Sequence, residues 1–173
     1  PNSLRIRFQQ VECYRSILKM IKNEALPAER KELMANALMI LKIIEGINTL
    51  DGYAAETRGH LLLENSDIAV DNWRDKAVDE FKKALLFHPQ QFRARTALAK
   101  LLEEEGRRDE AVRLMNDGVN YFYLMGISGL DEFYKYAIKL NLMSGDTTKV
   151  RELQRKNYTL KEWRSTQSIF LEN

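Results

Sequence analysis

Glu56, His60 and Glu64 are the residues of this chain whose types and spacing come nearest to a chemical site. Spacings of four residues place the three side chains on one face of a helix. Carboxylates and imidazoles can bind a metal, but this stretch offers a single histidine, and no second helix with further ligands is evident. We therefore interpret the three residues as a solvated helix face with favourable pairs, and we predict no metal site and no cofactor.

The sequence contains none of the motifs that carry catalysis on known folds. A phosphate-binding glycine loop, an HExxH pair and paired CxxC motifs are absent, and so is the GxSxG nucleophile elbow. The two histidines, His60 and His88, fall in different predicted elements. Cys13 is the only cysteine, which excludes an internal disulfide and a cysteine metal cluster. We expect this cysteine to be buried as a small hydrophobe, and we predict no catalytic residue.

Composition narrows the class of protein. A length of 173 residues favours one domain, and eight glycines and three prolines favour long helices over a many-turned β fold. The net charge of +2 gives no reason to expect a nucleic-acid partner. No apolar run reaches the ~18 residues of a membrane span. The compartment stays open between the cytoplasm, which is slightly favoured, and an extracytoplasmic domain of a membrane protein.

A short sequence recurs within the chain. Residues 74–78, RDKAV, return as RDEAV at 108–112, a shift of 34 residues (108 minus 74). The same shift places Phe81 opposite Met115 and Ala84 opposite Gly118. A fixed period of this size is typical of stacked helical hairpins.

Residues 74–119 resemble the tetratricopeptide repeat. The second helix of that repeat carries a small residue, an aromatic, another small residue and a closing proline, which here are Ala77, Phe81, Ala84 and Pro89. The following first helix has a similar pattern at Arg95, Leu98, Ala99 and Leu102. The sequence departs from the family at Arg95, where tryptophan is common, at Leu102, where tyrosine is common, and at Tyr123, where a second proline is expected.

The resemblance implies an all-α fold, a right-handed stack of antiparallel helical hairpins with about nine helices in a single domain, 1–173. Within it we expect an N-terminal helical pair (1–50), the best repeat-like hairpins (51–125), a degenerate hairpin (126–158) and a capping helix (159–173). The predicted helices are 3–22, 27–45, 52–64, 74–87, 91–105, 109–125, 130–143, 147–156 and 159–171. A capping box at Thr159 and Glu162 opens the last of these.

Small residues should lie where helices cross closely. We expect Ala77 and Ala111 to be buried at such crossings, because helices approach only where no bulky side chain intervenes. Gly59 has the same interpretation in helix 52–64. The loop 65–73 carries Ile68 and Val70, which we expect to tuck under the hairpin; a docking loop is the alternative.

The concave side of the stack is the expected binding surface. In the resembled family, the first helix of each hairpin lines this side, which places Arg93, Thr96, Lys100 and Glu103 there from helix 91–105. Helix 130–143 adds Lys135 and Lys139. The cationic members of this set, with Thr96, predict a protein or peptide partner that is acidic or extended, while simply solvated lysines are the alternative. The aromatic run 121–123 is a further candidate surface, although core packing also explains it.

The function predicted from the sequence is a non-catalytic scaffold or adaptor that holds a protein or peptide in the concave groove. Two alternatives stay open: an accessory domain of a larger enzyme, including a membrane enzyme, or part of a transport or secretion assembly, with a secretion-chaperone role among them. The chain begins at Pro1 without an initiator methionine, which predicts a processed, trimmed or partial chain. The sequence leaves the partner and the oligomeric state open.

Overall fold

The computed structural model describes the backbone of residues 2–24, 26–48, 52–121 and 129–171, and the side chains of these residues except 2–3 and 161–171. Every regular element in this part of the chain is an α-helix, which confirms the expected all-α fold. No helix in these ranges is both long and apolar enough to cross a membrane. The helices are α1 (Asn2–Met20), α2 (Pro27–Ile47), α3 (Gly52–Glu64), α4 (Trp73–Phe87), α5 (Phe92–Glu104), α6 (Arg108–Gly118), α7 (Leu130–Met143) and α8 (Thr147–Leu171).

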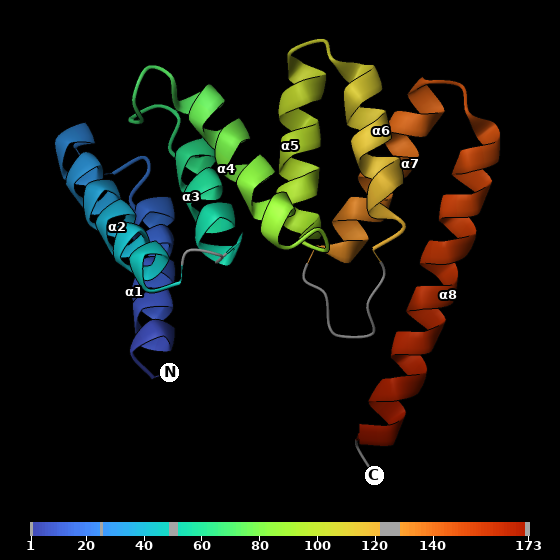
Figure 1. The fold of residues 1–173 in the computed structure, drawn as a ribbon, viewed down its shortest axis with the longest axis horizontal. Coiled ribbons are helices and arrows are strands. Elements are labelled where there is room, and N and C mark those ends of the chain that lie inside the picture. Colours follow the sequence, from blue (N-terminus) through green and yellow to red (C-terminus); the bar gives the residue numbers. More distant parts are fainter. Residues whose placement is uncertain (1, 25, 49–51, 122–128, 172–173) are drawn as a thin grey trace.

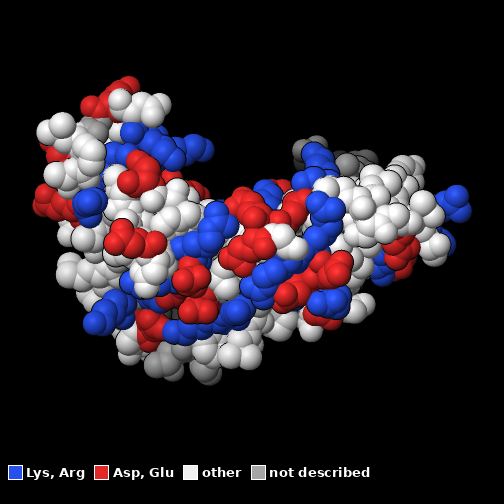
Figure 2. Space-filling view, turned by 90° about the horizontal axis from the view of Figure 1, so that it is seen from above, with Lys and Arg blue, Asp and Glu red and all other residues white. Residues whose placement is uncertain are grey.

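The helices form four antiparallel pairs that follow one another along a stack, α1–α2, α3–α4, α5–α6 and α7–α8 (Figure 1). Successive pairs touch, and the first helices touch directly as well, α3 with α5 and α5 with α7. From above, the stack is a crescent that is hollowed on one side (Figure 2). Direct contact between the first helices places them on the inner, shorter side of the curve, as in other helical solenoids. The concave face is therefore lined by α1, α3, α5 and α7.

Small residues fix how closely the helices of a pair approach. Ala77 and Ala111 have no exposed surface, as the repeat predicts. Gly59 of α3 lies against Phe81 of α4 so closely that a Cβ atom at position 59 would stand 2.6 Å from the ring. Since Phe81 is fully buried, the α3–α4 crossing depends on the missing side chain of Gly59.

Arg95 takes the place of the tryptophan that the repeat usually has. Its side chain is 3% exposed, and its guanidinium donates hydrogen bonds to the carbonyl oxygens of Leu114 (2.9 Å) and Pro89 (2.8 Å). The guanidinium also lies 5.1 Å from the ring centroid of Tyr121. Hydrogen bonds from a charged donor are stronger than neutral ones. Arg95 therefore ties α5 both to α6 and to the turn that precedes α5.

Two helix ends differ from the sequence prediction. The helix expected over 109–125 ends at Gly118, because the backbone then tightens into hydrogen bonds between residues three apart, such as Tyr121 N–H to Gly118 C=O (3.1 Å). Phe122 and Tyr123 lie outside the described residues. The expected break before Thr159 is also wrong, since α8 runs through it, and the Thr159 hydroxyl donates to the Arg155 carbonyl one turn earlier (3.0 Å).

The continuity of α8 gives eight helices in the described chain, close to the predicted nine, and puts the boundary at 159 inside a helix. The side chains that were expected to cap the stack, Trp163, Ile169 and Phe170, lie outside the described ones. The division into four segments stays a prediction.

Two burial predictions need correction. In the loop after α3, Ile68 is buried as expected, whereas Val70 is 50% exposed. Cys13 was expected to be buried and is exposed, because it lies on the side of α1 away from the buried residues Val11 and Leu18.

Candidate partner-binding site

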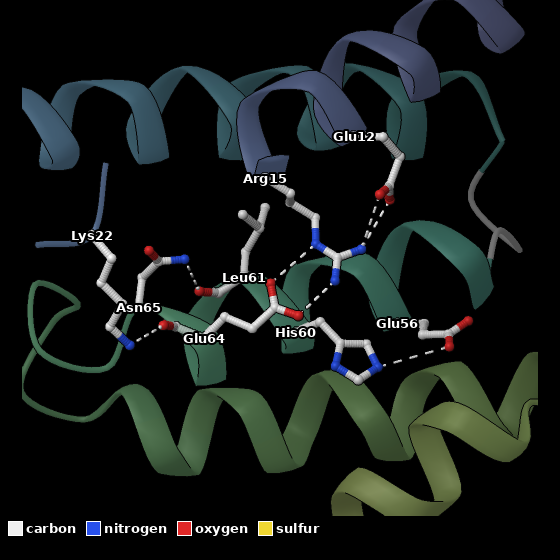
Figure 3. A network of polar contacts seen from close by, with 8 residues as sticks. All are labelled: Glu12, Arg15, Lys22, Glu56, His60, Leu61, Glu64 and Asn65. Atoms are coloured by element: carbon white, nitrogen blue, oxygen red, sulfur yellow. Dashed lines mark hydrogen bonds and ion pairs between the residues drawn. The ribbon is translucent and has the colours of Figure 1, made fainter. Parts of the chain in front are cut away.

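The concave face of α3 carries a network of polar contacts that joins it to α1 (Figure 3). Arg15 of α1 donates to both carboxylate oxygens of Glu64 (2.7 and 3.3 Å) and also to Glu12 (2.9 Å). The Lys22 ammonium donates to the Glu64 backbone carbonyl (3.1 Å). These bonds hold the end of α3 against α1 and neutralise Glu64.

Glu56 and His60 lie further along the same face, and both are largely buried. Their side chains are 11% and 13% exposed, so the expected solvated face is wrong for these two residues. Burial, helped by the charges of Arg93 and Arg15, lowers the pKa of His60 to about 4. Burial raises the pKa of Glu56, although the same two cations oppose this effect. His60 is therefore neutral at physiological pH.

Glu56 and His60 do not form a bonded acid–base pair. The Nε2 atom of His60 lies 3.9 Å from the Glu56 carboxylate and has no hydrogen-bond partner among the described residues. The side chains described by the structure include no group of three or more potential ligands that could hold a metal ion. Glu56 and His60 are therefore two largely buried polar groups that are not bonded to each other.

Arg93 lies at the start of α5, close enough to polar groups of α3 and α7 to affect their titration. It is exposed, and within the described chain its guanidinium makes no hydrogen bond or ion pair. Its stem packs at Gly129, where an added Cβ atom would stand 2.4 Å from the Arg93 Cγ atom. Its charge acts on the titration of Glu56 and His60 of α3 and of Glu132 of α7. Arg93 is thus a positioned cation that lies among polar groups of three helices.

Two of the lysines expected on the concave face are engaged within the chain. Lys100 donates to Glu132 (2.6 Å), and this bond lowers the pKa of Glu132. Lys139 pairs with Glu103 (3.2 Å), which also accepts a hydrogen bond from the Tyr136 hydroxyl (2.5 Å). These pairs join α5 to α7 and neutralise most of the positive charge that the sequence placed here.

The remaining predicted residues have different surroundings. Thr96 is 3% exposed and its hydroxyl has no hydrogen-bond partner in the described part of the chain, so it contacts the core and not the solvent. Lys135 is exposed, and no contact with a carboxylate is found for it among the described side chains. The predicted set of Arg93, Thr96, Lys100, Lys135 and Lys139 therefore reduces to two free cations, Arg93 and Lys135. On the side of the molecule seen in Figure 2, acidic and basic groups are likewise interspersed.

Sequence reasoning missed the contribution of α1 and α3 to the concave face. Glu56, His60 and Glu64 had been singled out for their spacing, but their place on this face was not predicted. The sequence did contain the information. In a repeat protein the first helix of every hairpin turns the same side towards the concave face, so the rule applied to helix 91–105 also applies to helix 52–64. The contact with Arg15 has no counterpart in the sequence pattern, since Arg15 and Glu64 are 49 residues apart.

A second hollow lies between α2, α3, α4 and the loop after α3. It has a volume of about 780 Å³, with an apolar floor that includes Met34, Leu62 and Ile68. Its rim carries both signs of charge, for example Lys31, Lys76, Asp71 and Asp79. The hollow agrees with the alternative of a docking loop at 65–73, but the mixed rim favours no particular charge in a ligand.

Comparison with protein-family models and with curated proteins gives no match, whereas solved structures do match. The crystal structure of MamA aligns with a TM-score of 0.55 over 90% of this chain and 89% of that chain, at 15% sequence identity. TTC0263, a thermophilic TPR protein in Thermus thermophilus, aligns with a TM-score of 0.50 over 95% and 96%, also at 15% identity. The chain has a tetratricopeptide-repeat-like fold. At this identity the likeness concerns the fold, so the function of this TPR-like chain has to be inferred from its own residues.

Proposed function

We propose that the chain is a non-catalytic interaction scaffold whose concave face holds an extended acidic segment of a partner protein. The observation that supports this proposal is the position of Arg93. It is an exposed arginine at the start of α5, on the concave face. No carboxylate of the described chain forms an ion pair with it, although its charge affects the titration of Glu56 and Glu132. A guanidinium presents several N–H donors in a planar fork that suits a carboxylate.

The surroundings of Arg93 explain why a partner would bind there. Its stem is held by packing against Gly129, so less side-chain freedom is lost when a ligand binds. The ion pairs Lys100–Glu132 and Lys139–Glu103 fix the neighbouring helices. Lys135 lies one turn before Lys139 on α7 and supplies a second free cation for an extended ligand. Charges of this kind set the encounter rate and orientation more than the affinity.

The test uses fluorescent peptides rich in Asp and Glu, with matched peptides in which Asn and Gln replace the acids. Fluorescence anisotropy at low salt should show binding of an acidic peptide, weaker as salt rises. Arg93→Glu should weaken this binding at least about tenfold, since it removes one charge-assisted contact and adds a repulsive charge. Lys135→Glu should slow association while leaving the fold intact.

Arg113→Glu is the matched control, because Arg113 is an exposed arginine on α6 and its reversal changes the net charge equally. It should leave peptide binding nearly unchanged. Equal losses in Arg93→Glu and Arg113→Glu would show that only net charge matters. Equal binding of acidic and amide peptides, or of none, would contradict an acidic ligand.

A further inference from the structure

Exposed hydrophobic side chains are concentrated in the first helical pair. Of the large hydrophobic residues that are exposed in the described chain, the majority belong to α1, α2 and the turn between them. On α1 they are Ile6 (54% exposed), Ile17 (36%) and Met20 (69%), and on α2 they are Met39 (58%), Ile43 (39%) and Ile47 (55%). Cys13 of α1 is exposed as well.

The residues of α1 form one stripe that faces away from α3. Ile6, Cys13, Ile17 and Met20 are separated by seven, four and three residues, which are the spacings of one helix face. Arg15, which reaches across to Glu64 of α3, lies two positions from both Cys13 and Ile17. Two positions correspond to about 200° around a helix of 3.6 residues per turn, so the stripe lies on the opposite side from α3.

The same reasoning applies to α2. Met39, Ile43 and Ile47 recur every four residues and therefore share a face. Glu45 lies two positions from Ile43 and from Ile47, and it accepts hydrogen bonds from Arg58 of α3 and Lys83 of α4. The stripe of α2 therefore also faces away from α3 and α4. The two stripes together form the N-terminal patch, which consists of Ile6, Cys13, Ile17, Met20, Met39, Ile43 and Ile47. The helices that carry it, α1 and α2, lie at one end of the stack (Figure 1).

The charge of the patch indicates what can cover it. The patch itself holds no charged residue. Gln10 lies within the α1 stripe, and the α2 stripe continues to Asn36, Glu32 and Glu29, so its two carboxylates lie at the margin. A two-fold contact presses the same surface of two copies together. In such a contact a charged residue near the two-fold axis would face the same charge of the other copy and be repelled. An uncharged surface avoids this repulsion. The net charge of +2 adds little repulsion between whole copies.

The architecture of the chain points in the same direction. Inside the stack, each helical pair is covered by the next one, as α2 is by α3 and α4 by α5. The outer side of α1–α2 is the equivalent surface without a neighbour in the described chain. A second α1–α2 pair supplies a neighbour of the same kind.

We propose that the N-terminal patch is a homodimerisation surface, on which the α1–α2 pair of a second copy of this chain packs. This interface lies at the end of the stack and leaves the concave face open, so it goes beyond the proposed function and can fail or hold independently of it. A dimer of this kind presents two concave faces to a partner.

Sedimentation velocity of the full chain over a wide concentration range tests the proposal. The mass should rise from 20.2 kDa towards twice that value. Met20→Glu and Met39→Glu should each raise the dimer dissociation constant at least about tenfold, because a buried charge in the interface would lack a partner. Both side chains are more than half exposed, so the fold should survive, which circular dichroism checks.

Leu86→Glu is the matched control, since Leu86 is 76% exposed on α4, away from the patch. It should dimerise as the wild type does. The thiol of Cys13 gives a second readout, because alkylation of this only cysteine should slow as the dimer forms and should stay fast in Met39→Glu. A mass of 20.2 kDa at every concentration, or a dimer that Leu86→Glu weakens as much as Met39→Glu does, would overturn the proposal.

Discussion

Replacing Gly59 by alanine tests the close crossing of α3 and α4 on which the position of the concave face depends. The added Cβ atom would stand 2.6 Å from Cε1 of Phe81 and 2.9 Å from two further ring atoms. Carbon atoms prefer separations of about 3.5 Å or more, so the ring would have to move by roughly 1 Å. Phe81 is fully buried, and such overpacking costs about 1–3 kcal/mol.

A second glycine provides the control for helix propensity. Alanine is favoured over glycine in a helix interior by about 1 kcal/mol, and Gly46 in the last turn of α2 has no atom within 4 Å of an added Cβ. Gly46→Ala should therefore stabilise the chain slightly, by up to about 1 kcal/mol. Gly59→Ala should gain a similar amount from helix propensity, but it should also be destabilised by the overpacking against Phe81. The difference between the two variants should thus be about 1–3 kcal/mol.

Urea unfolding and thermal unfolding measure this difference. For a chain of this size, about 1 kcal/mol corresponds to a shift in Tm of roughly 2–4 °C. In a Phe81→Leu background the steric conflict is relieved, so Gly59→Ala should cost less there than in the wild type. Equal effects of Gly59→Ala and Gly46→Ala, or no coupling to Phe81→Leu, would refute the described crossing.

Three further predictions concern other parts of the chain. Arg95→Leu should destabilise by about 3 kcal/mol or more in urea unfolding, because the Leu114 and Pro89 carbonyls lose their donor; Arg95→Lys should recover little, since an ammonium lacks the planar fork. The pKa of His60 is lowered to about 4 from its usual value of 6.5, so the contribution of neutral His60 to the free energy of unfolding is fully present above pH 6.5 and is lost as the pH falls from there towards 4. In His60→Gln the free energy of unfolding should therefore change less with pH over this range. The same pH dependence in the wild type and in His60→Gln would contradict a buried neutral imidazole. Thr159→Pro should break α8 and cost about 3 kcal/mol, whereas an unchanged circular-dichroism spectrum would restore a helix start at 159.

The sequence predicted the repeat because its signal is local. The small residues Ala77 and Ala111 recur at a fixed period, and each is buried as the repeat requires. Helix ends were predicted less well, as at Gly118 and Thr159. After Gly118 the backbone turns through hydrogen bonds between residues three apart, and the hydroxyl of Thr159 bonds back within α8 instead of capping it. Both outcomes depend on choices among local hydrogen bonds that the sequence alone does not rank.

The binding surface was predicted only in part, because charge pairing depends on contacts between distant residues. The periodicity placed Lys100, Glu103 and Lys139 on the concave face, but it did not predict the pairing across the two helices, Lys100 with Glu132 and Lys139 with Glu103. The pairing of half-buried Asn116 with buried Asn141 was also not predicted; their side-chain amides bond reciprocally at 2.9 and 3.1 Å, and the two residues are 25 positions apart in sequence. Free cations such as Arg93 can be recognised only after such partners have been assigned.

An NMR titration of the chain with an acidic peptide tests the proposed concave-face site most directly. Backbone amide shifts should change around Arg93 and at neighbouring positions of α3 and α7, including His60 and Lys135, and they should diminish as salt is added. Amides of the loop 65–71 and of the N-terminal patch should change little. Shifts concentrated instead around the hollow between α2 and α4, with the residues near Arg93 unaffected, would contradict the assignment of the concave face.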